Sequence, residues 1–290
     1  FYLYHAEENN ITHLATINTN ILKEQMSAMF PIEYKSRDGL NIQGYLTVPS
    51  GTSGKNLPTV ILVHGGPTSR DYWGYRADVQ LLASRGYAVL QVNFRGSWGY
   101  GKNFTTAGFK QWGKKMQDDI TDGATWLVDQ GVADKDKIAI FGSSYGGYSA
   151  LAGVTFTPDV YACGIAYVGP SNLFTLLNNL PSYWEPEKEM LFEMIGHPVA
   201  DSVLLYNASP VFHTENIKVP LFIAQGGNDP RVRKEESEQM VDALRSRDQH
   251  VVYMLKENEG HGFKLEENRL EFYKAMMGFL AEQMPATSIK

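Results

Sequence analysis

The sequence has 290 residues, 43% hydrophobic and 20% charged, so it can bury a large core and is not intrinsically disordered. Its formal net charge of −6 disfavours nucleic-acid binding, and its longest apolar runs, such as 59–63, are too short to cross a bilayer. The single cysteine, Cys163, excludes an internal disulfide and a zinc site built from several thiolates.

The first 30 residues are predicted to be a separate β-hairpin segment. Residues 3–5 and 13–17 flank a polar turn at 7–10. A lone hairpin is barely stable in water, so we interpret this segment as the end of a preceding domain; a natural N-terminal arm is the alternative. No targeting signal is visible, which leaves the compartment open between cytoplasm and periplasm.

From about residue 31 the chain alternates strands and helices. Strands are expected at 31–37, 41–48, 59–64, 87–93, 138–142, 161–168, 219–225 and 250–256. Helices are expected at 74–85, 118–130, 145–156, 233–247 and 266–283. The hairpin turn Arg37-Asp38-Gly39 makes the first two strands antiparallel, and intervening helices make the later strands parallel.

The pattern therefore predicts that residues 31–290 form one α/β domain, in which a mostly parallel sheet with an antiparallel start carries helices on both faces. Residues 169–218 are an insertion without a sheet strand. Long connections at the carboxyl edge of such a sheet usually form caps or binding walls, and a solvent-facing helical excursion is the alternative.

The segment Gly142-Ser143-Ser144-Tyr145-Gly146 fits the pattern G-x-S-x-G. The pattern alone is weak, but here it follows an apolar strand and opens a helix of small residues. This order is typical of the nucleophile elbow, a strained turn that exposes a serine hydroxyl above the sheet. Ser144 is therefore the candidate nucleophile.

A serine hydroxyl needs a base, which a carboxylate in turn orients, and the expected chain order is Ser, Asp, His. Of the seven histidines, His261 lies in a glycine-flanked loop after the last strand, where it can reach over the sheet edge. Of the five aspartates between Ser144 and His261, only Asp229 directly follows a buried strand. These three residues form the predicted triad.

A tetrahedral intermediate also needs hydrogen-bond donors for its oxyanion. The backbone N–H of Tyr145, the residue after the nucleophile, is one predicted donor. The second is predicted in the loop 64–67 (HGGP), where paired glycines let the backbone approach closely, with Gly66 favoured over Gly65.

With these residues in place, the chain resembles the catalytic domain of the prolyl oligopeptidase family over about residues 31–284. It is most similar to the acylaminoacyl peptidase and dipeptidyl peptidase branch. Further motifs that carry the resemblance are 93–101 (NFRGSWGYG), 145–148 (YGGY), 181–186 (PSYWEP) and 228–232 (NDPRV). The resemblance implies an α/β-hydrolase fold and a preceding β-propeller that restricts entry to short peptides. No metal or organic cofactor is expected.

Four residues are candidate substrate-binding residues. The resemblance matches Arg231 to an arginine that holds a substrate carbonyl, and a surface salt bridge is the alternative. Tyr183 and Trp184 either wall an apolar pocket or belong to the core. The fourth is Val168, at the end of its predicted strand. Residues 233–235 (RKE) depart from the Val-Pro of prolyl oligopeptidase itself, so the resemblance does not extend to proline specificity.

We therefore predict a serine peptidase that hydrolyses short or N-blocked peptides by acyl transfer. A carboxylesterase with the same triad is the first alternative, because the fold alone does not distinguish the two. A non-catalytic binding domain is the second alternative. The expected partners are a short peptide or a small ester, with no nucleic acid and no membrane, and the sequence leaves homo-oligomerisation open.

Overall fold

One mixed sheet forms the body of the chain in the computed structural model, which describes residues 1–16, 19 and 21–286. Within these residues, eight strands pair in the order β10-β9-β8-β7-β5-β6-β4-β3. Their bounds are β3 (Met29–Lys35), β4 (Asn41–Thr47), β5 (Leu57–Val63), β6 (Ala88–Asn93), β7 (Ala133–Ser143), β8 (Cys163–Tyr167), β9 (Leu221–Gly226) and β10 (Val251–Lys256). As predicted, β3 and β4 are antiparallel and the later strands pair in parallel; β4 is also antiparallel to β6, a pairing that was not predicted.

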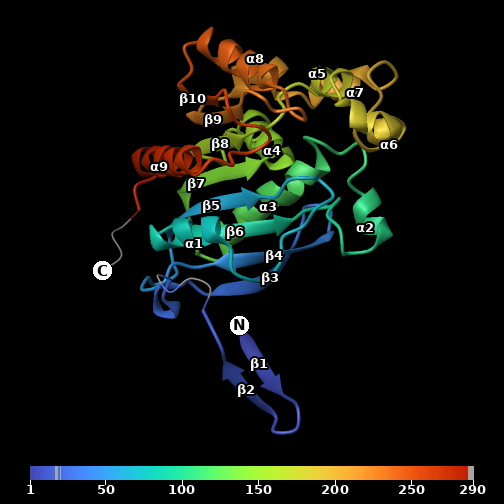
Figure 1. The fold of residues 1–290 in the computed structure, drawn as a ribbon. Helices are drawn as coiled ribbons and strands as arrows, with labels where there is room; N and C mark the ends of the chain where they lie inside the picture. The colour runs from blue at the N-terminus through green and yellow to red at the C-terminus, as the bar shows by residue number, and fades with distance from the viewer. Residues whose placement is uncertain (17–18, 20, 287–290) are drawn as a thin grey trace.

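Helices cover both faces of the sheet (Figure 1). On one face, α1 (Ala77–Ser84) and α9 (Glu266–Gln283) pack over Val60 and Leu62 of β5. On the other, α3 (Lys115–Asp129), α4 (Tyr145–Phe156) and α8 (Lys234–Arg245) belong to the apolar cluster that contains Ile61 and Val63. Successive β5 side chains thus enter opposite cores, which explains why this strand is a continuous apolar run.

The predicted strands and helices are all present, with two notable differences. Strand β7 begins at Ala133 instead of 138, because Ala133 pairs with Leu57 before the register shifts. The short helix α2 (Lys102–Thr106) was not predicted. It is a five-residue helix without buried residues, so it shows no amphipathic period in the sequence.

The insertion between β8 and β9 folds into short helices beside the carboxyl ends of the parallel strands (Figure 1). They are α5 (Leu173–Asn178), η2 (Ser182–Glu187), α6 (Lys188–Ile195), α7 (Ser202–Asn207) and η3 (Pro210–Asn216). The backbone N–H of Lys110 donates to the Met194 carbonyl at 2.7 Å, and the Lys110 Nζ lies 2.8 Å from an Asp201 carboxylate oxygen. These contacts fasten α6 and α7 to the body of the domain.

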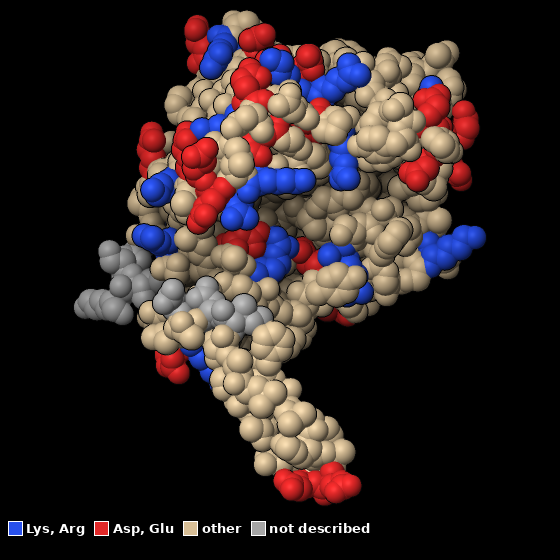
Figure 2. All heavy atoms as spheres, viewed as in Figure 1, with Lys and Arg blue, Asp and Glu red and all other residues tan. Residues whose placement is uncertain are grey.

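The start of the chain forms a two-stranded hairpin that projects from the body (Figures 1 and 2). Strands β1 (Tyr2–His5) and β2 (Asn10–His13) pair antiparallel, so the second strand lies before the predicted 13–17, and residue 17 is outside the described residues. Several of its large apolar side chains are exposed, including Tyr2 and Ile11. The assignment of this segment to a preceding propeller stays a prediction.

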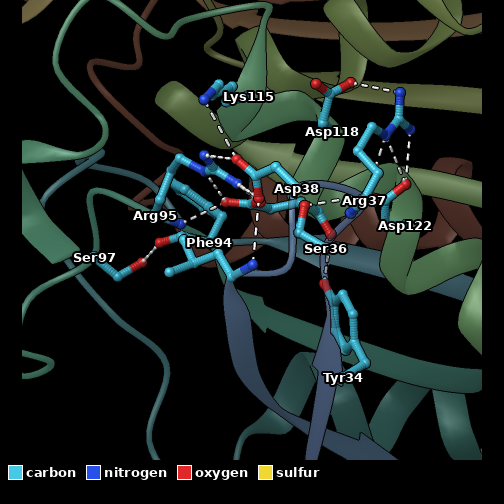
Figure 3. Close-up of polar contacts among 12 residues, drawn as sticks. Tyr34, Ser36, Arg37, Asp38, Phe94, Arg95, Ser97, Lys115, Asp118 and Asp122 are labelled. Carbon is cyan, nitrogen blue, oxygen red and sulfur yellow. Dashed lines mark hydrogen bonds and ion pairs between the residues drawn. The ribbon is translucent and has the colours of Figure 1, made fainter.

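A buried ionic cluster joins the β3–β4 turn to α3 and to the loop after β6 (Figure 3). The Asp119 carboxylate accepts hydrogen bonds from the Arg95 backbone N–H, Nε and Nη2 at 2.9, 2.8 and 2.7 Å. Asp38 binds the same guanidinium through Nη1 and Nη2 at 2.8 and 2.9 Å. Because the Asp119 side chain is fully buried, this cluster fixes the loop 94–97 against α3.

Replacing Asp119 by asparagine should lower the free energy of unfolding by about 3 kcal/mol, because Arg95 would then be buried with only half of its negative partners. Burial raises the pKa of Asp119 even though Arg95 donates to it, so the loss comes mainly from the buried guanidinium, which would keep Asp38 but lose the charge of Asp119. Urea unfolding measures the change. Asp136→Asn, which breaks an exposed pair with Lys135, is the control and should change little. Equal midpoints for the two variants would contradict the prediction.

Candidate active site

Ser144 occupies a sharp turn between β7 and α4, as the motif predicts. Its φ of 59° lies in the left-handed region, which is strained for a residue with a Cβ. A Cβ at Gly146 would lie 2.1 Å from the Val63 carbonyl oxygen, and one at Gly142 would lie 2.5 Å from the Gly146 backbone. Only glycine therefore fits at these two positions, and the turn presents the Ser144 side chain at the carboxyl edge of the sheet.

Asp229 and His261 are in direct contact at the same edge. The distance between Asp229 Oδ2 and His261 Nδ1 is 2.7 Å, and the Asp229 side chain is fully buried. The other carboxylate oxygen, Oδ1, accepts the backbone N–H groups of Arg231 and Val232 at 2.9 and 3.0 Å. These two bonds fix the carboxylate, so Oδ2 can orient the imidazole and hold its proton on Nδ1.

The His261 loop is anchored next to the serine turn by Tyr167, the last residue of β8. The Tyr167 carbonyl accepts the Ser144 N–H at 2.9 Å, and the Tyr167 hydroxyl accepts the Phe263 N–H. One residue therefore contacts both the Ser144 turn and the His261 loop. In the part of the chain that the structure describes, the Ser144 hydroxyl itself makes no hydrogen bond, to His261 or to any other group.

The two predicted donors beside Ser144, the backbone N–H groups of Tyr145 and Gly66, have no acceptor among the described residues. Tyr145 is the first residue of α4, where the helix dipole also favours negative charge. Gly66 has φ of 119°, and a Cβ at Gly65 would lie 3.4 Å from the Ser144 Cβ. The loop 64–67 thus packs against Ser144, and its role as an oxyanion donor stays a prediction.

Ser144 lines a pocket of about 240 Å³ that lies between the sheet edge and the helices of the insertion. Its wall is mainly apolar and comes from five parts of the chain. The apolar lining side chains are Pro67, Trp112, Tyr145, Pro170, Leu176, Leu180, Trp184, Met190, Leu191, Met194, Ile195 and Val232. Two charged residues, Glu187 and Arg231, also line it, and neither forms an ion pair among the described residues.

The four candidate substrate-binding residues occupy different environments. Trp184 and Arg231 line the pocket, with the guanidinium carbon 6.0 Å from the Trp184 ring centroid. Tyr183 is 55% exposed and packs edge-on against Trp184 outside the pocket lining. Val168 is fully buried and also outside the lining, and its N–H continues the sheet ladder to the Ala224 carbonyl at 2.8 Å.

Three polar residues that support the site carry no local sequence signal. Besides Tyr167, Glu259 accepts the N–H groups of Lys264 and Leu265 at 2.8 and 2.9 Å and so shapes the loop after His261. The buried Glu236 of α8 accepts the N–H groups of Ser171 and Asn172 at 3.0 and 2.9 Å, where the insertion begins.

Within residues 1–16, 19 and 21–286, no group of three or more His, Cys, Asp or Glu side chains is arranged to hold a metal ion. No helix in the same residues is both long and apolar enough to span a membrane.

Comparison with known proteins gives a consistent result. The sequence profile of the prolyl oligopeptidase family matches residues 73–287. Dipeptidyl aminopeptidase BIII of Pseudoxanthomonas mexicana is 45% identical, over 97% of this chain and 42% of that protein. A puromycin-hydrolyzing peptidase of Mycobacterium tuberculosis superposes with a TM-score of 0.87 at 29% identity, over 93% of this chain and 41% of that one. An acylaminoacyl peptidase of Pyrococcus horikoshii superposes with a TM-score of 0.87 at 26% identity, over 100% of this chain and 47% of that one.

The chain thus spans about two fifths of the length of the curated relatives it matches. The arrangement it shares with the solved structures is the α/β-hydrolase fold, which confirms the predicted fold class.

Proposed function

This chain belongs to the prolyl oligopeptidase family, as its motifs predicted, and we propose that it is a serine peptidase that cleaves short or N-blocked peptides by acyl transfer. The observation that carries the proposal is the 2.7 Å contact between His261 and Asp229, at the same sheet edge as the strained Ser144 turn. A carboxylate-bound imidazole at the same sheet edge as a partly exposed serine is the arrangement expected where a base activates a weak nucleophile.

In this mechanism Ser144 Oγ attacks the scissile carbonyl while His261 Nε2 accepts its proton. The Tyr145 and Gly66 N–H groups donate to the oxyanion of the tetrahedral intermediate. Protonated His261 then gives the proton to the leaving amine, and a water molecule, deprotonated by the same imidazole, hydrolyses the acyl-enzyme. Asp229 keeps the imidazole in the required tautomer and stabilises its positive charge.

The pocket supports a preference for an apolar residue on the acyl side of the scissile bond. Its lining is mainly aliphatic and aromatic, and Ser144 and Tyr145 lie at its wall. A carboxylate side chain in this pocket would lose its hydration beside Glu187, and Arg231 could pair with it only by giving up its proposed contact with the substrate carbonyl. Arg231 at the same wall, free of an ion pair among the described residues, is placed to donate to a substrate carbonyl.

The test compares N-blocked aminoacyl anilides that carry phenylalanine, leucine or aspartate at this position. We expect kcat/KM for phenylalanine and leucine to exceed that for aspartate by about 100-fold, because burying an unpaired carboxylate is costly. A p-nitrophenyl ester of the same acyl groups is measured in parallel. Rapid ester cleavage with no anilide cleavage would favour the carboxylesterase alternative, and no turnover of either substrate would contradict a catalytic role.

A further inference from the structure

The peptide bond between Gly65 and Gly66 links the predicted oxyanion donor to a buried side chain. This bond is trans, so the Gly65 carbonyl and the Gly66 N–H point in opposite directions from one rigid plane. Gly66 lines the pocket together with Ser144, whereas the Gly65 carbonyl accepts a hydrogen bond from His64. Any group that fixes the direction of the carbonyl also fixes the direction of the N–H.

The His64 ring is held on both of its nitrogen atoms and on one face. Nδ1 lies 2.8 Å from the Gly65 carbonyl oxygen, and Nε2 lies 2.9 Å from the Ser97 hydroxyl. The ring stacks on Phe94 with 4.4 Å between centroids, and His64 is only 8% exposed. A rotation of this ring would break both hydrogen bonds and the stacking contact together.

The partners of the ring determine which nitrogen carries the proton. A carbonyl oxygen only accepts, so Nδ1 must be the donor to Gly65. Burial lowers the pKa of His64, which favours the neutral ring with Nε2 as an acceptor for the Ser97 hydroxyl. The Ser97 hydroxyl is also 2.7 Å from the Phe94 carbonyl oxygen, which has two lone pairs and can accept both this hydroxyl and the Ser97 N–H. Ser97 thus has two acceptors for its hydroxyl proton, the Phe94 carbonyl and His64 Nε2, and with either one Nδ1 stays the donor to Gly65.

Ser97 is itself part of a fixed loop. Arg95, two residues earlier, binds Asp119 through its backbone N–H and its guanidinium. The contacts thus form a continuous series from the buried ionic cluster through Ser97 and His64 to the Gly65–Gly66 peptide.

We propose that His64 is a positioning residue, whose Nδ1–H holds the Gly65 carbonyl so that the Gly66 N–H points at the developing oxyanion. The inference rests on the proposed function and extends it to a side chain that acts through a backbone group, without touching the substrate. As His64 precedes Ser144 in the chain, it does not fit the expected order for the base, and this contact gives it a separate role.

The matched pair of variants is His64→Asn and His64→Leu in the full chain. Asparagine and leucine have nearly the same shape and lose the same stacking, but only asparagine keeps an N–H donor near the Nδ1 position. We expect kcat for the anilide to be about 10- to 100-fold lower in His64→Leu than in His64→Asn. This is less than the decrease in kcat of about 10²- to 10³-fold that follows the complete loss of an oxyanion donor, because the Gly66 N–H is misdirected and not removed. KM should be similar in the two variants. The affinity for a peptide boronate, which forms a tetrahedral adduct, should fall in parallel with kcat.

A purely structural role would lower the thermal stability of both variants and leave their kcat values equal, and that result would overturn the positioning role. If either variant does not fold, Ser97→Ala is the second test. It should lower kcat without changing KM, while Ser149→Ala, which removes an equally buried hydroxyl bound to Gln117, should not. An unchanged kcat in Ser97→Ala would also overturn the role. Wild-type protein that neither cleaves the anilide nor reacts with a fluorophosphonate at Ser144 would instead overturn the proposed function, and this inference with it.

Discussion

Replacing Ser144 by alanine should lower kcat for the anilide by about 10⁴- to 10⁶-fold, because no other hydroxyl can form the acyl-enzyme. Alanine must adopt the same positive φ as serine, and the Ser144 hydroxyl makes no hydrogen bond among the described residues. The unfolding midpoint should therefore stay close to that of the wild type. Steady-state kinetics measure the loss, and a fluorophosphonate probe followed by peptide mapping should label Ser144 in the wild type and nothing in the variant.

The adjacent serine supplies a matched control. Ser143 is the last residue of β7, and its backbone carbonyl, not its hydroxyl, faces Gly65. Ser143→Ala should thus retain both turnover and labelling. A label on Ser143, or turnover that survives in Ser144→Ala, would contradict the assignment of the nucleophile.

The sheet could be predicted from the sequence because its strands are either continuous apolar runs or are joined by recognisable turns. Strand β5 is buried on both faces, and Gly39, with φ of 88°, closes the turn between β3 and β4. The arrangement of the insertion could not be predicted in this way. Its helices are short, and long-range contacts such as that of Lys110 with Asp201 fix them, which no local period reveals.

The residues of the candidate site likewise include some that local sequence patterns predict and others that only the packed fold brings into place. Ser144, Asp229 and His261 each lie in a turn whose glycines are visible in the sequence, and strand order alone predicts that they share one edge. Tyr167 and Glu236 support the site through hydrogen bonds to residues 96 and 65 positions away. Such partners depend on the packed fold and have no motif of their own. Val168 was predicted to bind substrate from its place at the end of a strand, but its side chain is buried and does not line the pocket. A position near the sheet edge therefore does not ensure that a side chain reaches the pocket.

Asp229→Asn should be nearly as damaging as loss of the nucleophile, for a reason that the hydrogen bonds around the carboxylate define. Oδ1 accepts the N–H groups of Arg231 and Val232, so an asparagine must keep its carbonyl oxygen at that position. Its NH₂ group then takes the place of Oδ2, which lies 2.7 Å from His261 Nδ1 in the wild type, and donates a hydrogen bond to Nδ1. The neutral imidazole would carry its proton on Nε2 and could not accept one from Ser144.

We expect kcat to fall by about 10⁴-fold, the usual cost of the wrong tautomer in a Ser-His-Asp triad, with little change in KM. Labelling of Ser144 by the fluorophosphonate should slow in proportion, since that reaction needs the same base. Asp242→Asn, which alters an exposed aspartate of α8, is the control and should leave both rates unchanged. If Asp229→Asn kept most of its kcat, the imidazole would have to be oriented by another group, and the 2.7 Å contact would be structural only. The kcat of Asp229→Asn thus distinguishes a carboxylate that orients the catalytic imidazole from one that only stabilises the loop.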